Sequence, residues 1–317
     1  MKPTTRLLFL SAAALCAILL TPASAAGSGN IFQSLQQPGD PCDWSGWYVG
    51  FNTGGSFNHF DLGNHTSSVD LTDQFYDLMS VVGVPGDTFA VFDFSGHTVH
   101  DTVPIGGGQT GFNLQFGHFV IGVEGGFSGN HSMASASDQQ FKITEFVVNE
   151  EENVTAETIF NSERSAEIIW NGFIGGHAGF AWNRLLFYVA GGAAFTDIHL
   201  CAMEKADTSF FRPGDGAGAT VQPKQDQLGG FIGEIVSKKT SFRGDVLTGW
   251  YAGGGTDWML FKNVSMGVEY RHVDWGNMNG NFMSGGPVFP GSTNFGVSAD
   301  QVMFKVNIMI AQFSPFH

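Results

Sequence analysis

The sequence predicts an all-β protein, an eight-stranded antiparallel up-and-down transmembrane β-barrel with short periplasmic turns and four long extracellular loops. Two patterns carry this prediction. Large apolar residues alternate with glycine and polar residues through stretches of strand length, and tight turns alternate with long connections. The composition agrees, because charged residues make up only 14% of the chain, whereas soluble domains carry roughly 25%.

The chain divides into two N-terminal segments and one folded domain. Residues 1–25 begin with basic residues, continue in an apolar run and end in small residues, the order typical of a cleaved secretory signal peptide. The apolar run is short for the alternative, a membrane anchor. Residues 26–43 contain Pro38 and Pro41 and are expected to form a flexible periplasmic leader. Residues 44–317 are expected to form the barrel with its loops.

The first three predicted strands are 44–57, 106–116 and 119–127, and a tight turn at Gly117-His118 joins the second to the third. Successive side chains of a strand point to opposite faces. One face of each strand is large and apolar, and the other carries mainly glycine and polar residues. The apolar faces comprise Trp47, Val49, Phe51, Phe112, Leu114, Phe116, Phe119, Ile121, Val123 and Phe127.

The next two predicted strands, 168–182 and 185–195, flank a tight turn at 183–184. The polar face of the first carries Gly175 and His177 opposite large apolar residues. Large apolar residues alternate with small and polar ones here as in the preceding hairpin, so we expect the apolar face to be turned outward.

The hairpin over 247–276 and the final strand 302–310 complete the set. In the hairpin, the face opposite the large apolar residues carries Glu269 and Arg271, which are able to pair. A soluble sandwich would bury its large residues, whereas a membrane barrel turns them toward lipid and keeps polar residues inside. A soluble antiparallel hairpin remains an alternative for this stretch taken alone.

The connections between the predicted strands differ strongly in length. The tight ones are 117–118, 183–184 and 261–263, and the long ones are 59–105, 129–164, 197–246 and 277–298. Bacterial outer-membrane barrels have short periplasmic turns and longer extracellular loops. An even number of strands then places both ends of the barrel on the periplasmic side.

Four blocks of the sequence together resemble a known family. They are WSGWYVGFNTGGSF, GGGQTGFNLQFGHFVIGVEGGFS, WNGFIGGHAGFAWNRLLFYVAGGAAF and GWYAGGGTDWMLFKNVSMGVEYRHVDWG. They are similar to the small outer-membrane β-barrel proteins of alphaproteobacteria, the porin-like or outer membrane immunogenic protein group with an OmpA-like barrel architecture. The resemblance implies eight strands, a role as a surface antigen or envelope component, and no catalytic residues. It also implies arginines at the positions of Gly175 and His177, so the interior charge balance differs here.

Six polar residues are expected to form a network inside the barrel. Eight strands leave an interior just wide enough to be filled by side chains. Buried charges require partners, so the basic residues should bridge the carboxylates and close the interior, with one carboxyl protonated or a water trapped, because acids outnumber bases. The six residues are Glu124, His177, Asp257, Glu269, Arg271 and Lys305.

Other candidate sites receive weaker support from the sequence. The first long loop contains four histidines with aspartates nearby, but their spacing matches no compact metal site, so we expect neither a metal nor a cofactor. His272 is the only residue worth considering as a catalytic base, with Asp274 at the same parity. We expect no enzyme activity. The loop histidines are His59, His65, His97 and His100.

We therefore expect a non-enzymatic barrel in the cell outer membrane, with a structural and surface-interaction role in the cell envelope. Its expected partners are outer-membrane lipid and lipopolysaccharide, and an extracellular protein or host surface that meets the loops. The net charge of −15 argues against nucleic acid. The alternatives are a small porin that passes ions or small solutes and a soluble lipocalin-like carrier, which the polar interior disfavours. We expect no disulfide between Cys42 and Cys201, because the topology places them on opposite sides of the membrane.

Overall fold

A computed structural model gives the structure of the chain and describes residues 43–79, 88–149, 152–212, 230–280, 288–289 and 293–312. The expected signal peptide, nearly all of the expected leader, and Cys42 lie outside the described residues. Cys201 was expected to begin a loop but lies within a strand, with its thiol free.

The described residues are almost entirely β-strand. In chain order the elements are β1 (Gly46–Asp70), α3 (Leu71–Met79), β2 (Phe89–Phe94), β3 (His97–Phe116), β4 (Phe119–Asn149), β5 (Glu152–Trp182), β6 (Leu185–Phe211), β7 (Phe231–Phe261), β8 (Val264–Gly280), β9 (Val288–Phe289) and β10 (Thr293–Gln312).

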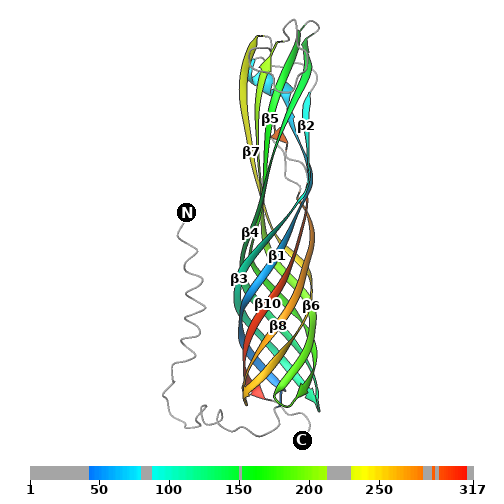
Figure 1. Cartoon of the computed structure of the whole chain (residues 1–317), viewed down its shortest axis with the longest axis vertical. Helices are drawn as coiled ribbons and strands as arrows, with labels where there is room; N and C mark the ends of the chain where they lie inside the picture. The colour runs from blue at the N-terminus through cyan, green and yellow to red at the C-terminus, as the bar shows by residue number, and fades with distance from the viewer. Residues whose placement is uncertain are drawn as a thin grey trace, which may run out of the picture.

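The long strands form a closed antiparallel ring (Figure 1). Neighbours in sequence pair in the order β1-β3-β4-β5-β6-β7-β8-β10, and β10 pairs back to β1. The short strands β2 and β9 pair with the far end of β1. The chain is therefore an all-β, up-and-down sheet that closes in a ring, as the sequence predicted at this level.

The tight turns are confirmed. Gly117 has φ +63° and Asn183 has φ +54°, a left-handed conformation that glycine and asparagine adopt most readily. The third turn lies between Phe261, the last residue of β7, and Val264, the first residue of β8.

The outward face of the ring is apolar near these turns. Its exposed residues include Val49, Phe51, Ile121, Val123, Ile174, Val189, Val268, Phe304, Ile308 and Ile310. Exposed aromatic residues lie at both edges of this apolar band. Beside the turns they include Trp47, Phe119, Phe180, Trp182 and Trp258, and at the other edge Phe127 and Trp250, with Trp170 packed on Phe127.

The prediction of four long loops was wrong, because most of those residues continue the strands. β4 and β5 stay paired as far as Asn149 and Glu152, and β6 and β7 as far as Phe211 and Phe231. Each predicted strand ends where the large outward residues become less regular. That point marks the end of the apolar band rather than the end of backbone pairing.

The strands beyond the band form what we call the tower. It comprises α3, β2, β9 and the ends of the long strands farthest from the tight turns. In β1, β4 and β6 these are the residues after Phe60, Asn130 and Ile198, and in β5 and β7 the residues before Ile168 and Val246. The ring narrows midway and continues upward, with α3 at the top (Figure 1). α3 begins after Asp70, whose carboxylate accepts hydrogen bonds of 3.0 Å from the backbone N–H groups of Thr72 and Asp73. This side chain caps the helix N-terminus.

Three buried apolar clusters fill the interior at successive levels. The lower cluster, near the tight turns, includes Trp44, Tyr48, Leu186, Tyr188, Met259 and Met309. The middle cluster includes Phe60, Ile168, Ile198, Trp275, Phe295 and Val297. The upper cluster, inside the tower, includes Val69, Leu71, Phe75, Phe92, Phe160 and Phe210. In the described part of the chain, no helix has the length and apolarity needed to cross a membrane.

Adjacent glycines on β1 test the closure of the ring. A β-carbon on Gly54 would overlap the carbonyl oxygen of Val302 on β10, whereas one on Gly55 would meet nothing within 4 Å. We predict that Gly54→Ala lowers the free energy of unfolding by about 1–3 kcal/mol, the usual cost of overpacking. Gly55→Ala is the matched control and should have little effect. Urea unfolding of the refolded protein measures both free energies of unfolding, and equal losses in the two variants would contradict the pairing of β1 with β10.

Candidate functional site

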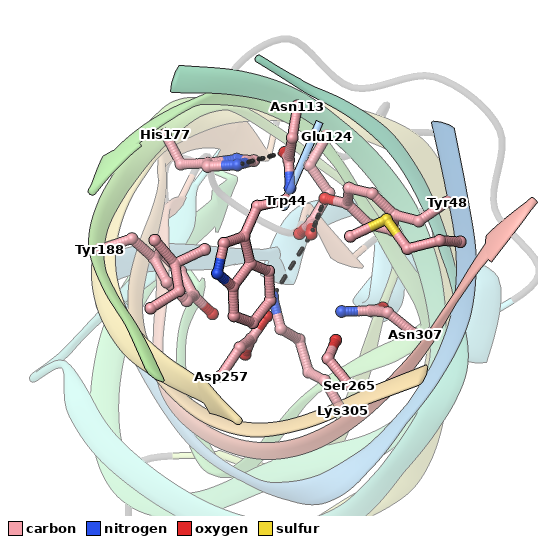
Figure 2. Close-up of a pocket in the computed structure, with 12 residues that line it drawn as sticks. Trp44, Tyr48, Asn113, Glu124, His177, Tyr188, Asp257, Ser265, Lys305 and Asn307 are labelled. Carbon is pink, nitrogen blue, oxygen red and sulfur yellow. Dashed lines mark hydrogen bonds and ion pairs between the residues drawn. The ribbon is translucent and has the colours of Figure 1, made fainter. Parts of the chain in front are cut away.

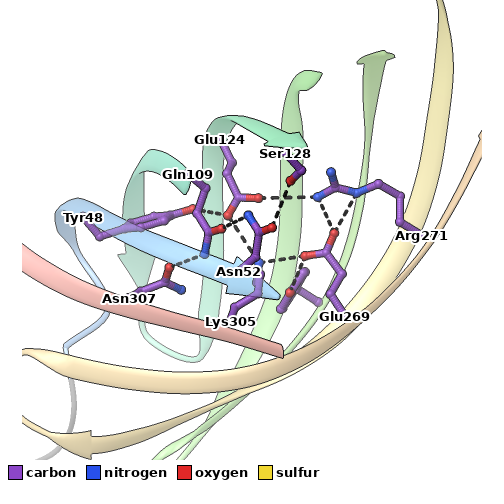
Figure 3. Close-up of polar contacts among 10 residues, drawn as sticks. Tyr48, Asn52, Gln109, Glu124, Ser128, Glu269, Arg271, Lys305 and Asn307 are labelled. Carbon is purple, nitrogen blue, oxygen red and sulfur yellow. Dashed lines mark hydrogen bonds and ion pairs between the residues drawn. The ribbon is translucent and has the colours of Figure 1, made fainter. Parts of the chain in front are cut away.

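Four charged residues from three strands meet inside the ring (Figure 3). They lie between the lower apolar cluster, which supplies Tyr48 and Tyr188, and the middle one, which supplies Tyr251. Lys305 on β10 places Nζ 2.7 Å from Oε2 of Glu269 and 3.3 Å from Oε2 of Glu124. Arg271 donates from Nε and Nη2 to Oε1 of Glu269, the first at 3.0 Å, and its Nη2 lies 3.7 Å from Oε1 of Glu124. All four are buried. The carboxylates therefore bridge both cations, and β4, β8 and β10 are joined across the interior.

Aromatic side chains hold this charged cluster in place. The Tyr48 hydroxyl donates to Glu124 at 2.7 Å, and the Tyr188 hydroxyl donates to Glu269 at 2.8 Å. The Arg271 guanidinium lies 3.6 Å from the centroid of the Phe173 ring and 4.6 Å from that of Tyr251, distances at which cations and aromatic faces attract. Each carboxylate thus has cations and a hydroxyl as partners.

A row of amides lies beside the charged cluster and joins β1, β3 and β10 (Figure 3). Asn52 donates to Gln109 at 2.6 Å, Gln109 donates to Asn307 at 2.7 Å, and Ser128 donates to Asn52 at 2.9 Å. Sequence reasoning did not select these residues or the tyrosines. Their inward parity was visible in the sequence, but uncharged residues gave no reason to expect a specific contact.

His177 and Asp257 lie inside the ring but outside the four-residue cluster. His177 places Nε2 2.8 Å from Oδ1 of Asn113, so Nε2 carries the proton and donates. Asp257 is buried, and its Oδ1 has no hydrogen-bond partner. Both residues line a cavity of about 10 Å³ next to Trp44, whose ring lies across the interior (Figure 2). This volume is close to the minimum for one water molecule.

The charges inside do not balance. Glu124, Asp257 and Glu269 face only two basic side chains, and the ion pairs of the described residues leave Asp257 without a cation. The apolar clusters on both sides separate these charged side chains from the two ends of the ring. The arrangement braces the walls and fills the interior.

The loop histidines do not converge on a metal site. The rings of His59 and His100 are 4.7 Å apart, but His65 contacts Ser162 inside the tower, and His97 pairs with Asp138. Within the described residues, no group of three or more histidine, cysteine or acidic side chains could hold a metal ion. His59 and His100 therefore contact each other, whereas His65 and His97 each have a partner elsewhere.

His272, the one residue considered as a catalytic base, has a carboxylate partner that the sequence did not indicate. Its Nδ1 lies 2.9 Å from Oδ1 of Asp300 on the neighbouring strand, and Asp300 also accepts from the Tyr270 hydroxyl at 2.7 Å. Asp274 instead accepts from the backbone N–H of Gly276. The partner comes from cross-strand register, which spacing along one strand does not reveal.

A second polar group lies buried in the tower. Glu204 pairs with Arg164 and accepts from the Ser67 hydroxyl at 2.7 Å. His65 is also buried, contacts Ser162 at 2.9 Å and stacks on the Phe94 ring at 4.8 Å. Burial, reinforced by the Arg164 guanidinium, lowers the pKa of His65 to about 4.

The charged cluster should be essential for stability. We predict that Arg271→Ala lowers the free energy of unfolding by about 3–5 kcal/mol, because it leaves buried carboxylate charge with one cation fewer. The exposed Lys262 in the turn between β7 and β8 provides the control, and Lys262→Ala should change little. Urea unfolding in detergent micelles gives both values. A loss below about 1 kcal/mol for Arg271→Ala would show that the charged cluster does not stabilise the fold.

The tower should lose stability in mild acid through His65. Below about pH 6.5 the unfolded chain binds a proton that the folded chain excludes until about pH 4. The free energy of unfolding therefore keeps its full value above the unfolded pKa, and it falls by up to about 3 kcal/mol as the pH drops through this window. Hydrogen exchange of tower amides at both ends of the window measures this loss in the wild type and in His65→Gln. An identical loss in the variant would assign the effect to other groups.

Known proteins offer only distant similarity. No protein-family model matches the chain, and no curated protein matches its sequence. Similar solved structures include a FadL homologue of Pseudomonas aeruginosa, at 7% identity and TM-score 0.28, covering 84% of this chain and 91% of that chain. Neisserial surface protein A, NspA, has 9% identity and TM-score 0.28 over 84% and 98%. The outer membrane protease OmpT of Escherichia coli has 8% identity and TM-score 0.27 over 84% and 97%. Similarity at these TM-scores carries no argument about function, which must come from the chain's own geometry.

Proposed function

We propose that the chain is an eight-stranded transmembrane β-barrel of the bacterial outer membrane. The observation that carries this proposal is the outward apolar band with aromatic residues at both edges, around an interior filled with hydrogen-bonded polar side chains. In water, that arrangement would expose the large residues and bury the charges. In a bilayer it satisfies both faces.

The barrel stands with its tight turns in the periplasm and its tower outside the cell. Tight periplasmic turns and longer extracellular segments are usual for such barrels. The tower takes the place of the long loops expected from the sequence. Its strands add an extended, paired surface beyond the membrane.

Its role is structural and surface-interacting, without catalysis. The interior supports this role, because ion pairs and apolar clusters fill it at successive levels. The outward face of the tower carries exposed apolar residues, including Met133, Phe141, Ile143 and Phe242, which suits contact with an extracellular protein or host surface. The barrel wall meets outer-membrane lipid and lipopolysaccharide. The resemblance to the alphaproteobacterial barrel group also implies an envelope or surface role without catalytic residues.

A small porin is the alternative. The observation that favours it is Asp257, an unpaired buried carboxylate beside a cavity inside the ring. A continuous path would also have to pass Trp44 below and the middle cluster around Phe60 and Trp275 above. A structural and surface-interacting role with a closed interior is therefore better supported than a porin.

Location and orientation can be tested together. We predict that the chain fractionates with the outer membrane and needs detergent for extraction. In a background with Cys42 and Cys201 replaced by serine, Lys238→Cys in the tower should react with a membrane-impermeant maleimide on intact cells. Lys262→Cys in the periplasmic turn should react only after the outer membrane is permeabilised. Both lysines are exposed on the same hairpin.

Two results would reject the proposal. Recovery in the soluble periplasm without detergent would reject the membrane location. Labelling of Lys262→Cys but not Lys238→Cys on intact cells would reverse the orientation.

A further inference from the structure

A patch of apolar side chains lies on the outward face of the tower, where β4 and β5 run as a paired hairpin. Phe141 on β4 and Ile159 on β5 are direct cross-strand partners, and Ile143 follows Phe141 on the same face. They are 54%, 41% and 47% exposed, respectively. Ile143 is the cross-strand partner of Glu157, so a carboxylate stands among the three apolar side chains. We call these four residues the Glu157 patch.

The patch lies too far from the apolar band for lipid to cover it. From Asn130, where the tower begins on β4, to Phe141 the strand rises about 36 Å, at roughly 3.3 Å per residue. β5 runs beside it up the tower (Figure 1). Contiguous exposed apolar side chains outside the membrane mark a surface that another molecule covers.

The Glu157 carboxylate is only partly solvated. Its Oε1 is shielded from solvent and, among the described residues, has no hydrogen-bond partner. Burial raises the pKa of Glu157. Such a carboxylate has lost hydration without gaining a partner, so a cation that pairs with it forms a stronger hydrogen bond than at a fully exposed carboxylate. The patch therefore favours a cationic ligand.

The charges around the patch are also negative. In the described tower, every charged residue of outward parity on β4 and β5 is a glutamate. Lys142 has the opposite parity, and its ammonium donates to the carbonyl oxygen of Val91 on β2 at 3.0 Å. Lys205 on β6 is held by Asp207 at 2.7 Å. The outward glutamates are Glu145, Glu157, Glu163 and Glu167.

We propose that the Glu157 patch is a docking surface for a segment of an extracellular protein that presents arginine beside apolar side chains. A guanidinium fits this surface better than an ammonium, because it pairs with a carboxylate through two parallel hydrogen bonds and stacks on an aromatic ring such as that of Phe141. The apolar side chains of the segment cover Ile143 and Ile159.

A second copy of the chain is a poor occupant of the patch. The chain has a net charge of −15, and like charges that face each other across an interface disfavour association. A basic partner gains from the same charge. The inference deepens the proposed surface-interacting role and rests on the tower lying outside the cell.

The test uses the refolded full chain in dodecyl maltoside micelles and a short fluorescent peptide. In the peptide, serine alternates with leucine and arginine in turn, so that leucine and arginine share one face when the peptide is extended. Fluorescence anisotropy in about 0.1 M salt gives the dissociation constant. Glu157→Gln should raise it at least about tenfold, the effect of losing a charge-assisted hydrogen bond. Phe141→Ser should raise it about fivefold, because apolar area is no longer buried.

Two variants are matched controls. Glu163→Gln removes the same charge from the same face of β5, about 20 Å along the strand from Glu157, which is beyond the screening length of about 10 Å. Phe242→Ser removes an exposed phenylalanine from β7, which is separated from β4 by β5 and β6. Both should keep the wild-type dissociation constant within about twofold. Circular dichroism establishes that each variant is folded.

Two further peptides test the chemistry of the partner. Replacing every arginine by glutamate should abolish binding, and replacing every leucine by serine should weaken it at least about fivefold. No binding of the arginine–leucine peptide to the wild type would overturn the proposal. Equal losses in Glu157→Gln and Glu163→Gln would also overturn it, because they would assign the binding to general negative charge.

The position of the tower is tested separately, by labelling of Lys238→Cys on intact cells. Peptide binding at the patch together with this labelling would support the proposal. Labelling without peptide binding would overturn the docking surface and leave the membrane orientation standing. Peptide binding without labelling would overturn the extracellular partner through the orientation and not through the patch.

Discussion

The interior of the ring depends on how Arg271 and Lys305 are neutralised. A basic side chain removed from water is tolerated only with anionic partners and hydrogen bonds. Glu124 and Glu269 supply these partners from β4 and β8, and each carboxylate is also held by a tyrosine hydroxyl. Because the contacts cross the ring, the same ion pairs that satisfy the charges also brace the walls.

The alternation of strand side chains connects this interior to the membrane. One parity supplies lipid-facing residues, and the other supplies either the charged cluster or the apolar clusters above and below it. Inward glycines make the cluster possible: a β-carbon on Gly111 or Gly255 would overlap the Tyr48 or Tyr188 ring, respectively. The closed barrel therefore follows from where large, small and charged residues fall within one alternating pattern.

The sequence was sufficient for the ring and the inward direction of the charged residues, because both follow from parity. It was also sufficient for the tight turns, which Gly117 and Asn183 mark. It was insufficient for strand length, since pairing continues into the tower where the outward residues cease to be regularly apolar. It also missed partners set by register: His272 contacts Asp300 on the neighbouring strand, and Gln109 joins Asn52 to Asn307. Such contacts depend on which residues of different strands lie at the same height, and one strand's sequence does not contain that information.

The claim that most needs measurement is that side chains close the barrel. Single-channel recording of the purified wild-type protein in a planar bilayer tests it most directly. The charged cluster, sealed by Trp44 on one side and by the cluster around Trp275 on the other, predicts an insulating membrane without reproducible steps after insertion. Steady, reproducible conductance steps would contradict the closed interior and support the small porin.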